Sequence, residues 1–367
     1  MIKKILKGLG RLAALSVILA SLYLVNLFFM KPYSIDHYLG KELLLELMDS
    51  PEAMTYIGVF DRFNWLTKHN SKLSIPQEDD IEKDIVDLEK SIKTLYKYDD
   101  SKLSDNQRIT KKIAIFDLEN SLKELKEFPY LDYPINQIGG IHLNTVEFMS
   151  GMHPIRNKSE ANDYIKRVNL IKEVYKGVLK DLEKQAINEI YPPEFVYGHV
   201  IKQLNEFINY SYDDHPLYSQ FMMKVDKLEL SDEDLKNFDL EIKKAIDESV
   251  TPGFKLLLGF MKKTQKNANK NHGIWSQPGG DEYYKLRIRT YTTTDFSPEE
   301  IHQMGLSEVE RISNRMREIL TSLGYDTAKS VGEIMNELNE NPDFLYADTP
   351  DRKEIVVNDY MKMVDEA

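Results

Sequence analysis

Histidine spacing is the first test for a hydrolytic metal site in this sequence. A helical zinc peptidase site needs two histidines one helical turn apart, with a glutamate next to the first to activate water. None of the histidines has another histidine four residues further on, and none is followed by glutamate. We therefore expect surface or hydrogen-bonded structural histidines and assign no metal ligand. The full set is His37, His69, His142, His153, His199, His215, His272 and His302.

Other catalytic groups are also missing from the sequence. The chain has no cysteine, so a thiolate nucleophile is excluded. It lacks the Gly-x-Ser-x-Gly turn of serine hydrolases, a phosphate-binding loop and a dinucleotide fingerprint. Its many carboxylates are spaced along amphipathic helices, where a solvated face is the expected role. The sequence therefore predicts no catalytic residue and no cofactor within this chain.

One stretch has the composition of a contact surface. Alternating aromatic and β-branched residues after the Gly279-Gly280 turn predict a β-strand that can pair with an extended peptide. The alternative is a β-hairpin that only packs on helices, with the threonine triplet ending the strand. The candidate substrate groove consists of Trp275, Tyr283, Tyr284, Tyr291, Thr292, Thr293 and Thr294.

The elements that would position this groove are mainly helices. Apolar residues recur at helical spacing in most of the chain, and proline, glycine and capping residues mark the breaks. Ser104 with Gln107 and Ser297 with Glu300 predict capping boxes, and the apolar stripe of the helix after Ser297 is expected to be buried. Residues 129–158 carry several prolines and glycines and are expected to be a structured loop. The predicted fold is a mainly α, multi-helix domain with a small β-hairpin or short sheet near 270–296. Helices are expected over 81–95, 109–128, 159–182, 194–210, 231–249, 251–268 and 298–319, with two short ones in 327–367.

The N-terminus predicts a membrane anchor. Residues 1–11 are basic, and residues 12–30 contain no charged side chain. A helix of 18 such residues is roughly 27 Å long, close to the bilayer core. We expect residues 1–11 to be cytoplasmic, residues 12–30 to span the lipid bilayer once, and residues 31–367 to form an exported domain. A cleaved signal peptide and a buried helix are the alternatives.

Charge narrows the class of partner. The net charge is −12, from 48 basic and 60 acidic residues. The basic residues of segment 1–11 precede the apolar run, so the rest of the chain is more acidic still. Phosphate binding needs a basic face, so nucleic acid is excluded as a partner. The lack of cysteine also excludes disulfides and lipid attachment through an N-terminal cysteine.

Several motifs occur in the order found in a bacterial family. They are Tyr133-Pro134-Ile135-Asn136-Gln137 with Gly140, His153-Pro154, Pro192-Pro193-Glu194-Phe195-Val196, the block 273–280, Tyr291-Thr292-Thr293-Thr294-Asp295, and Pro298-Glu299-Glu300-Ile301-His302 with Gly305. This order resembles the bacterial "domain of unknown function 885" family from about residue 30 to the end.

The resemblance implies a lineage of mainly helical, gluzincin-like zinc metallopeptidases that are often exported. Members of the family carry a His-Glu-x-x-Pro-Gly-His block in the second half of a longer chain, and this sequence does not contain it. Zinc is therefore expected only in full-length relatives. The family layout also implies that the helix of His302 flanks the cleft, so His302 joins the candidate groove.

Two functional hypotheses follow. In the first, the chain is the truncated N-terminal half of such a peptidase, inactive alone, with a separately encoded C-terminal half as partner. In the second, it is a non-enzymatic, membrane-tethered module that binds peptides or a protein. Both place the chain at the cell inner membrane with its domain on the periplasmic or extracellular side.

Overall fold

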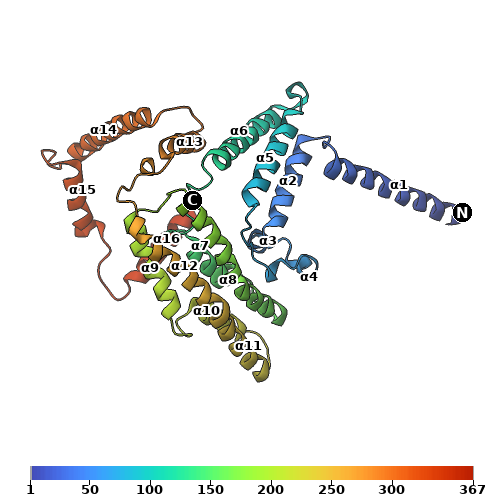
Figure 1. Ribbon diagram of the computed structural model, residues 1–367. Coiled ribbons are helices and arrows are strands. Elements are labelled where there is room, and N and C mark those ends of the chain that lie inside the picture. The colour runs from blue at the N-terminus through green and yellow to red at the C-terminus, as the bar shows by residue number, and fades with distance from the viewer. Residues whose placement is uncertain (1, 367) are drawn as a thin grey trace. The chain divides into compact units, whose positions relative to one another are not determined.

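The computed structural model describes residues 2–366, and it describes side chains from Arg11 onward except that of residue 12. The chain divides into two compact units, residues 1–290 and 291–367 (Figure 1). The first unit contains α1 (Ile2–Phe29), α2 (Ile35–Asp49), α3 (Pro51–Ile57), α4 (Asn64–Thr67), α5 (Asp80–Tyr96), α6 (Asp105–Glu127), α7 (Ile141–Glu147), α8 (Lys158–Ile187), α9 (Glu194–Asn209), α10 (Pro216–Val225), α11 (Asp232–Ala245), α12 (Thr251–Thr264) and α13 (Gly280–Thr292), whose last two residues lie past the division. The second unit contains α14 (Pro298–Ser322), α15 (Val331–Glu340) and α16 (Arg352–Glu366).

Helix α8 is the centre of the first unit. The side chain of Asn157 caps the start of the helix by accepting from the Glu160 amide, and apolar residues then recur at helical spacing. Tyr164 and Tyr175 are fully buried in it, α11 and α12 pack against it, and α9 packs on α12. The main core comprises Val168, Ile171, Val174, Val178, Tyr197, Val200, Leu204, Phe221, Ile242, Phe254, Leu257 and Met261, with further residues of the same elements.

Helices α11 and α12 are joined by a π-helical turn, η5 (Ile246–Val250). The turn adds a residue to the helical repeat, which shifts the faces on either side of it. Phe238 and Ile242 are buried before the turn, and Phe254 and Leu257 are buried after it, one position later than an uninterrupted repeat would place them. The turn therefore lets both halves of one helical rod face the core.

The predicted transmembrane helix over 12–30 is wrong. Within the part of the chain that the structure describes, no helix combines the length and the apolar character needed to traverse a bilayer. The end of the apolar run is instead occupied with local contacts. Asn26 is 4% exposed and bonds the carbonyl of Lys31 and the amide of Tyr33, while the Tyr23 ring packs 5.5 Å from His37. The predicted cytoplasmic segment, residues 1–11, lies mostly outside the part of the chain whose side chains the structure describes.

Helix α2 follows α1 and contacts it. A second small core joins α2 to α5, because Ile35 and Tyr38 are buried against Leu95 and Tyr98. Helices α5 and α6 lie against each other as an antiparallel pair (Figure 1). Ser104 and Gln107 form the predicted capping box at the start of α6.

The predicted β-hairpin near 270–296 is also wrong. No strand occurs among residues 2–366, and the segment forms η7 (Ile274–Ser276) and α13. The physical reason is a second periodicity in the same residues. Tyr283, Leu286, Arg287 and Thr290 are spaced as one helical face, and that face packs on α6.

The second unit is an open arrangement of three helices. Ser297 and Glu300 form the predicted capping box of α14, with Pro298 at its first position. Leu320 and Ile334 are the hydrophobic residues buried in the described part of this unit. The apolar stripe of α14 was expected to be buried, but Val309 is 64% exposed.

Candidate functional site

Sequence blocks that lie far apart in the chain meet at one junction of the first unit. The Glu194 amide donates to the Asn269 carbonyl at 2.9 Å, and the Asn269 amide donates to Pro192 at 3.2 Å. This isolated bridge joins the Pro192-Pro193 block to the segment after α12. The side chain of Gln277 adds a second link, because its amide nitrogen donates to the Tyr191 carbonyl at 2.6 Å.

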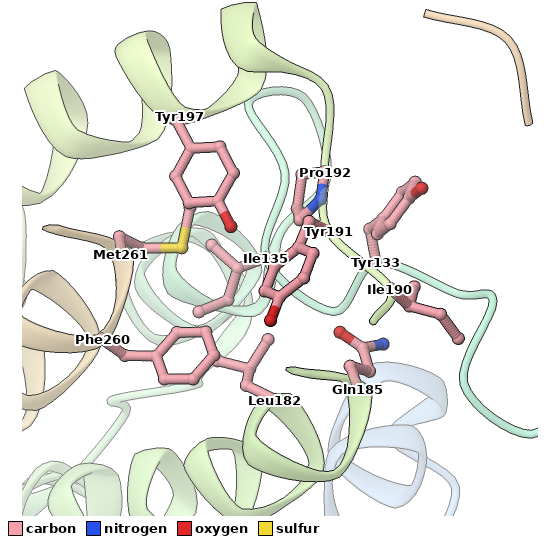
Figure 2. Close-up of a pocket in the computed structure, with 10 residues that line it drawn as sticks. All are labelled: Tyr133, Ile135, Leu182, Gln185, Ile190, Tyr191, Pro192, Tyr197, Phe260 and Met261. Carbon is pink, nitrogen blue, oxygen red and sulfur yellow. The ribbon is translucent and has the colours of Figure 1, made fainter. Parts of the chain in front are cut away.

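The junction surrounds a small hollow of about 10 Å³, roughly the room that one water molecule needs (Figure 2). Figure 2 shows aromatic and aliphatic side chains from the 129–140 loop, the end of α8, the following connection, α9 and α12 converging on it. The lining residues are Tyr133, Ile135, Leu182, Gln185, Ile190, Tyr191, Pro192, Tyr197, Phe260 and Met261.

Polar groups at the rim of the hollow are engaged with the protein. Gln185 donates to the Asp132 carbonyl, and the Tyr197 hydroxyl donates to Thr264 at 3.2 Å. Burial raises the pKa of Tyr133 to about 12, so its phenol is neutral at physiological pH. Ligand pockets for organic molecules usually enclose about 300–1,000 Å³. The hollow is far smaller and therefore fits a structural joint better than a catalytic pocket or a site for an organic ligand.

A close backbone approach fixes the 273–280 block beside this junction. A Cβ at Gly280 would lie 1.8 Å from the carbonyl oxygen of Ile274, so only glycine fits. Ser276 tightens the turn by donating to the Gly273 carbonyl at 2.7 Å and accepting from Asn269. Trp275 in this turn is 61% exposed, and its indole lies against Gly273.

The predicted groove residues do not gather on one strand. In the first unit, Tyr283 packs on Phe128 at 5.6 Å between ring centroids, and its hydroxyl donates to Glu124 at 3.3 Å. Burial raises the pKa of Tyr283 to about 12, and Glu124 adds to the effect. Tyr284 is about half exposed on the same helix. The structure thus makes Tyr283 a packing residue and leaves Trp275 and Tyr284 accessible.

The remaining predicted groove residues belong to the second unit. Tyr291 and Thr292 end α13, and Thr293 has a φ of 54°, a left-handed conformation that ends the helix. The Thr292 and Thr294 hydroxyls bond each other at 2.7 Å. His302 is exposed on the first turns of α14. The predicted groove residues are divided between the two units. That they form one groove therefore stays a prediction.

The side chains present do not fit a zinc ion. Among the described residues, no three His, Asp or Glu side chains lie close enough to share a metal. His142 of the 129–158 region bonds Gln203 at 3.0 Å through Nε2. The Gln203 amide nitrogen donates to the Gln137 carbonyl, so its oxygen faces the imidazole and Nε2 carries the proton. Burial lowers the pKa of His142 and keeps it neutral.

The most constrained polar cluster in the described residues surrounds Arg167 of α8. Its guanidinium is fully buried and donates to the Lys72 carbonyl at 2.7 Å, the His69 carbonyl at 2.9 Å, and the Thr55 hydroxyl at 2.7 Å. It also donates to the Pro51 carbonyl at 3.2 Å. Burial lowers the pKa of Arg167 to about 10, which leaves it charged at neutral pH. One cation therefore ties both ends of the segment 51–72 to the central helix.

His153 completes this Arg167 cluster. Its Nδ1 lies 2.9 Å from the Arg167 guanidinium and must accept, so Nε2 carries the proton and faces the Glu160 carbonyl at 3.3 Å. Burial, followed by the charge of Arg167, lowers the pKa of His153 to about 3. Lys224 holds the loop by donating to the His153 carbonyl at 3.0 Å. The imidazole is thus a neutral acceptor and cannot serve as a metal ligand here.

Sequence reasoning missed the Arg167 cluster, although a signal was present. Arg167 sits between Tyr164 and Val168 on the apolar stripe of α8. A charged residue on such a stripe is rarely fully buried unless its donors are satisfied. The partners come from segments about a hundred residues away, and no spacing rule links them.

The fold and the junction define the class: a helical protein built around α8, with motif blocks converging beside it. A family model described as "Bacterial protein of unknown function (DUF885)" matches residues 51–367, and the chain belongs to this family. No curated protein matches the sequence at a significant level.

Similar solved structures include two bacterial proteins. A protein from Colwellia psychrerythraea, described as a "putative lipoprotein", has a TM-score of 0.74 and 25% identity over 87% of this chain. One from Shewanella oneidensis, a "putative lipoprotein of unknown function", has a TM-score of 0.54 and 15% identity over 86% of this chain and shows the fold alone. The chain spans 57% of the length of each of these solved chains.

Proposed function

We propose that this chain is an exported protein of the cell envelope that supplies the non-catalytic helical part of a metallopeptidase-like fold. In this role it presents a packing surface to a further helical portion and does not hydrolyse peptides by itself. The resemblance to the gluzincin-like lineage suggests the peptidase context.

The observation that carries the proposal is the apolar face of α14, which the other helices of the second unit leave exposed. Val309, Ile312, Ile319 and Leu323 recur at helical spacing and are each at least 44% exposed. A long helix with such a face is stable in water only when another element covers it. The solved relatives extend well beyond the shared part, since the match covers 57% of their length. Their additional residues are the natural source of a covering element.

The envelope location is supported by the descriptions of the solved relatives. Lipoproteins are held at a membrane surface by a lipidated cysteine. The given sequence contains no cysteine, so the proposal rests on the envelope location and not on that form of attachment. A reporter enzyme that folds only outside the cytoplasm, fused after residue 366, should be active in cells. An inactive reporter together with an intact fusion protein would refute export.

Hydrolysis is tested on the purified chain with zinc in excess. We expect no cleavage of a mixed peptide substrate. Cleavage that a chelator abolishes and zinc restores would overturn the proposal. A second preparation carrying His142→Gln and His153→Asn would then identify whether these buried histidines had become ligands.

The partner is tested by reading the gene's neighbourhood for a reading frame that encodes His-Glu-x-x-Pro-Gly-His. Co-expression with that product should give a stable complex with zinc-dependent peptidase activity. Val309→Asp should break the complex, and Asn314→Asp, the same charge on the opposite face of α14, should not. If no such frame exists, or if both variants bind equally well, the role of α14 is refuted.

A second candidate function is a non-enzymatic peptide-binding module. It is favoured by Trp275, an exposed indole on a turn that Gly280 and Ser276 hold rigid, which is the usual form of a binding anchor. Pairing with a strand edge is not available, because α13 is a helix. Retention of peptides that is lost in Trp275→Ala and kept in Trp65→Ala would favour this candidate.

A further inference from the structure

A short segment of the first unit concentrates exposed apolar side chains. It covers residues 56–66, from the end of α3 through η1 (Asp61–Phe63) into α4, and we call it the aromatic tip. Isolated exposed apolar residues are ordinary, whereas a contiguous group marks a contact surface. Its exposed members are Tyr56, Ile57, Val59, Phe63, Trp65 and Leu66, with Trp65 74% exposed.

The aromatic tip has a fixed shape. Gly58 ends α3 with a φ of 69°, and its amide donates to the Met54 carbonyl. Asp61 pairs with Arg156 at 2.6 Å, and the Asn64 amide donates to Asp163 of α8 at 3.1 Å. On either side of the tip, the Arg167 cluster holds Pro51, Thr55, His69 and Lys72, as described above. The exposed side chains are therefore presented by anchored backbone.

The aromatic tip is bordered by charged side chains of both signs. Exposed basic residues Arg62, Lys68 and Lys72 lie in or next to it, while the chain carries a net charge of −12. The acids within and beside the tip are already paired, Asp61 and Glu160 with Arg156 and Asp163 with Lys166. The result is a small cationic, aromatic surface on an acidic protein.

We propose that the aromatic tip is a docking element for an anionic lipid surface. Tryptophan and tyrosine favour the boundary between headgroups and acyl chains, and basic side chains beside them bind anionic headgroups. A rigid projection can insert its side chains to that depth without ordering a loop on contact. The proposal rests on the envelope location proposed above, for which it names the lipid contact.

The sequence offers a clean optical test, because it contains two tryptophans, Trp65 in the tip and Trp275 outside it. In the full chain carrying Trp275→Phe, Trp65 is the sole tryptophan. Vesicles of phosphatidylglycerol and phosphatidylethanolamine should shift its emission to shorter wavelength, and brominated acyl chains should quench it. The matched variant Trp65→Phe leaves Trp275, whose emission should change little.

Further variants separate the tip from the apolar helix α1. Phe63→Ala in the Trp275→Phe background should raise the lipid concentration needed for half-maximal quenching by about tenfold, because an inserted aromatic side chain is lost. Arg62→Gln with Lys68→Gln should weaken quenching on anionic vesicles and leave the residual binding to phosphatidylcholine unchanged. Because quenching reports the position of Trp65, binding through α1 alone would not produce it.

Three outcomes would overturn the proposal. They are no quenching of Trp65, equal quenching of Trp65 and Trp275, and an emission shift of Trp65 that follows protein concentration without lipid, which would indicate a second copy. The vesicle experiment and the export reporter have separate readouts. Vesicle docking can fail while export is observed, and docking can be observed while export fails.

Discussion

Helices α8 and α14 share an amphipathic sequence pattern but differ in how much of each is buried. Both are long, amphipathic and started by a side-chain cap. Helix α8 buries residues along nearly its whole length, including Arg167, while Leu320 is the buried residue of α14. An apolar stripe thus determines which face of a helix needs a partner, and the rest of the chain determines whether that partner is supplied.

The largest expected effect comes from Arg167→Met, which would break the α8 side of this comparison. The variant leaves the carbonyls of Pro51, His69 and Lys72 and the Thr55 hydroxyl without their donor. Each unsatisfied buried group costs about 1–3 kcal/mol, so the free energy of unfolding should fall by about 5 kcal/mol. Urea denaturation followed by circular dichroism measures the loss. Arg311→Met on α14 is the matched control and should cost less than about 0.5 kcal/mol; a similar loss in both variants would contradict the prediction.

A core truncation beside α8 should have the next largest effect. Phe254 is fully buried and packs on Tyr175 and Phe207, with ring centroids 5.4 Å and 4.9 Å away. Phe254→Ala should lower the free energy of unfolding by about 3–5 kcal/mol, because it creates a cavity. Leu306→Ala on α14 should change it by less than about 0.5 kcal/mol. Equal losses in the two denaturation curves would mean that α14 is covered in solution.

Acid should destabilise the surroundings of α8 through His153. The pKa of His153 is about 3 in the folded chain and about 6.5 in an unfolded one, so the unfolded state binds more protons between these values. The contribution is complete above pH 6.5 and is lost as pH falls toward 3, at up to about 1.4 kcal/mol per pH unit. Arg167, Lys224 and Arg156 all disfavour the charged form.

The variant His153→Asn keeps an acceptor for Arg167 and removes this titration. Its free energy of unfolding should therefore depend less steeply on pH between 6.5 and 4 than that of the unmodified chain. His142 and His215 are also buried with lowered pKa values and maintain part of the slope. Identical slopes from denaturation at several pH values would show that His153 does not control the effect.

The smallest expected change in stability concerns α14 itself. Val309→Asp with Ile312→Asp should alter the free energy of unfolding by less than about 1 kcal/mol, since both side chains are largely exposed. Binding of an apolar dye should fall, because the apolar stripe is interrupted. Unchanged dye fluorescence would place the dye-binding surface elsewhere.

The helices were predictable because their apolar spacing and caps agree. Ser104 with Gln107 and Ser297 with Glu300 form the expected capping boxes, and the stripe of α8 is buried as predicted. The helix over 280–292 was not predictable, because its aromatic and β-branched residues fit both the two-residue period of a strand and the 3.6-residue period of a helix. Contacts from α6 selected the helix: Glu124 pairs with Arg287, and Phe116 lies under Arg289.

The candidate site was predictable in its parts but not in its assembly. The blocks around Tyr133, Pro192 and Gly280 were recognisable as sequence motifs, yet nothing in their order indicated that Gln277 would bond Tyr191. The Arg167 cluster depends on donors and acceptors about a hundred residues apart. Such long-range pairings are decided by the packing of α8 and are not encoded in local spacing.

The π-helical turn between α11 and α12 has an evolutionary consequence. A π-turn is what a helix forms when one residue is inserted and the flanking packing is kept. Removing one residue from 246–250 should therefore restore an ordinary helix with Phe238 and Phe254 still facing inward. Homologues that lack this residue would align with a single gap here, and the gap would mark when the insertion arose.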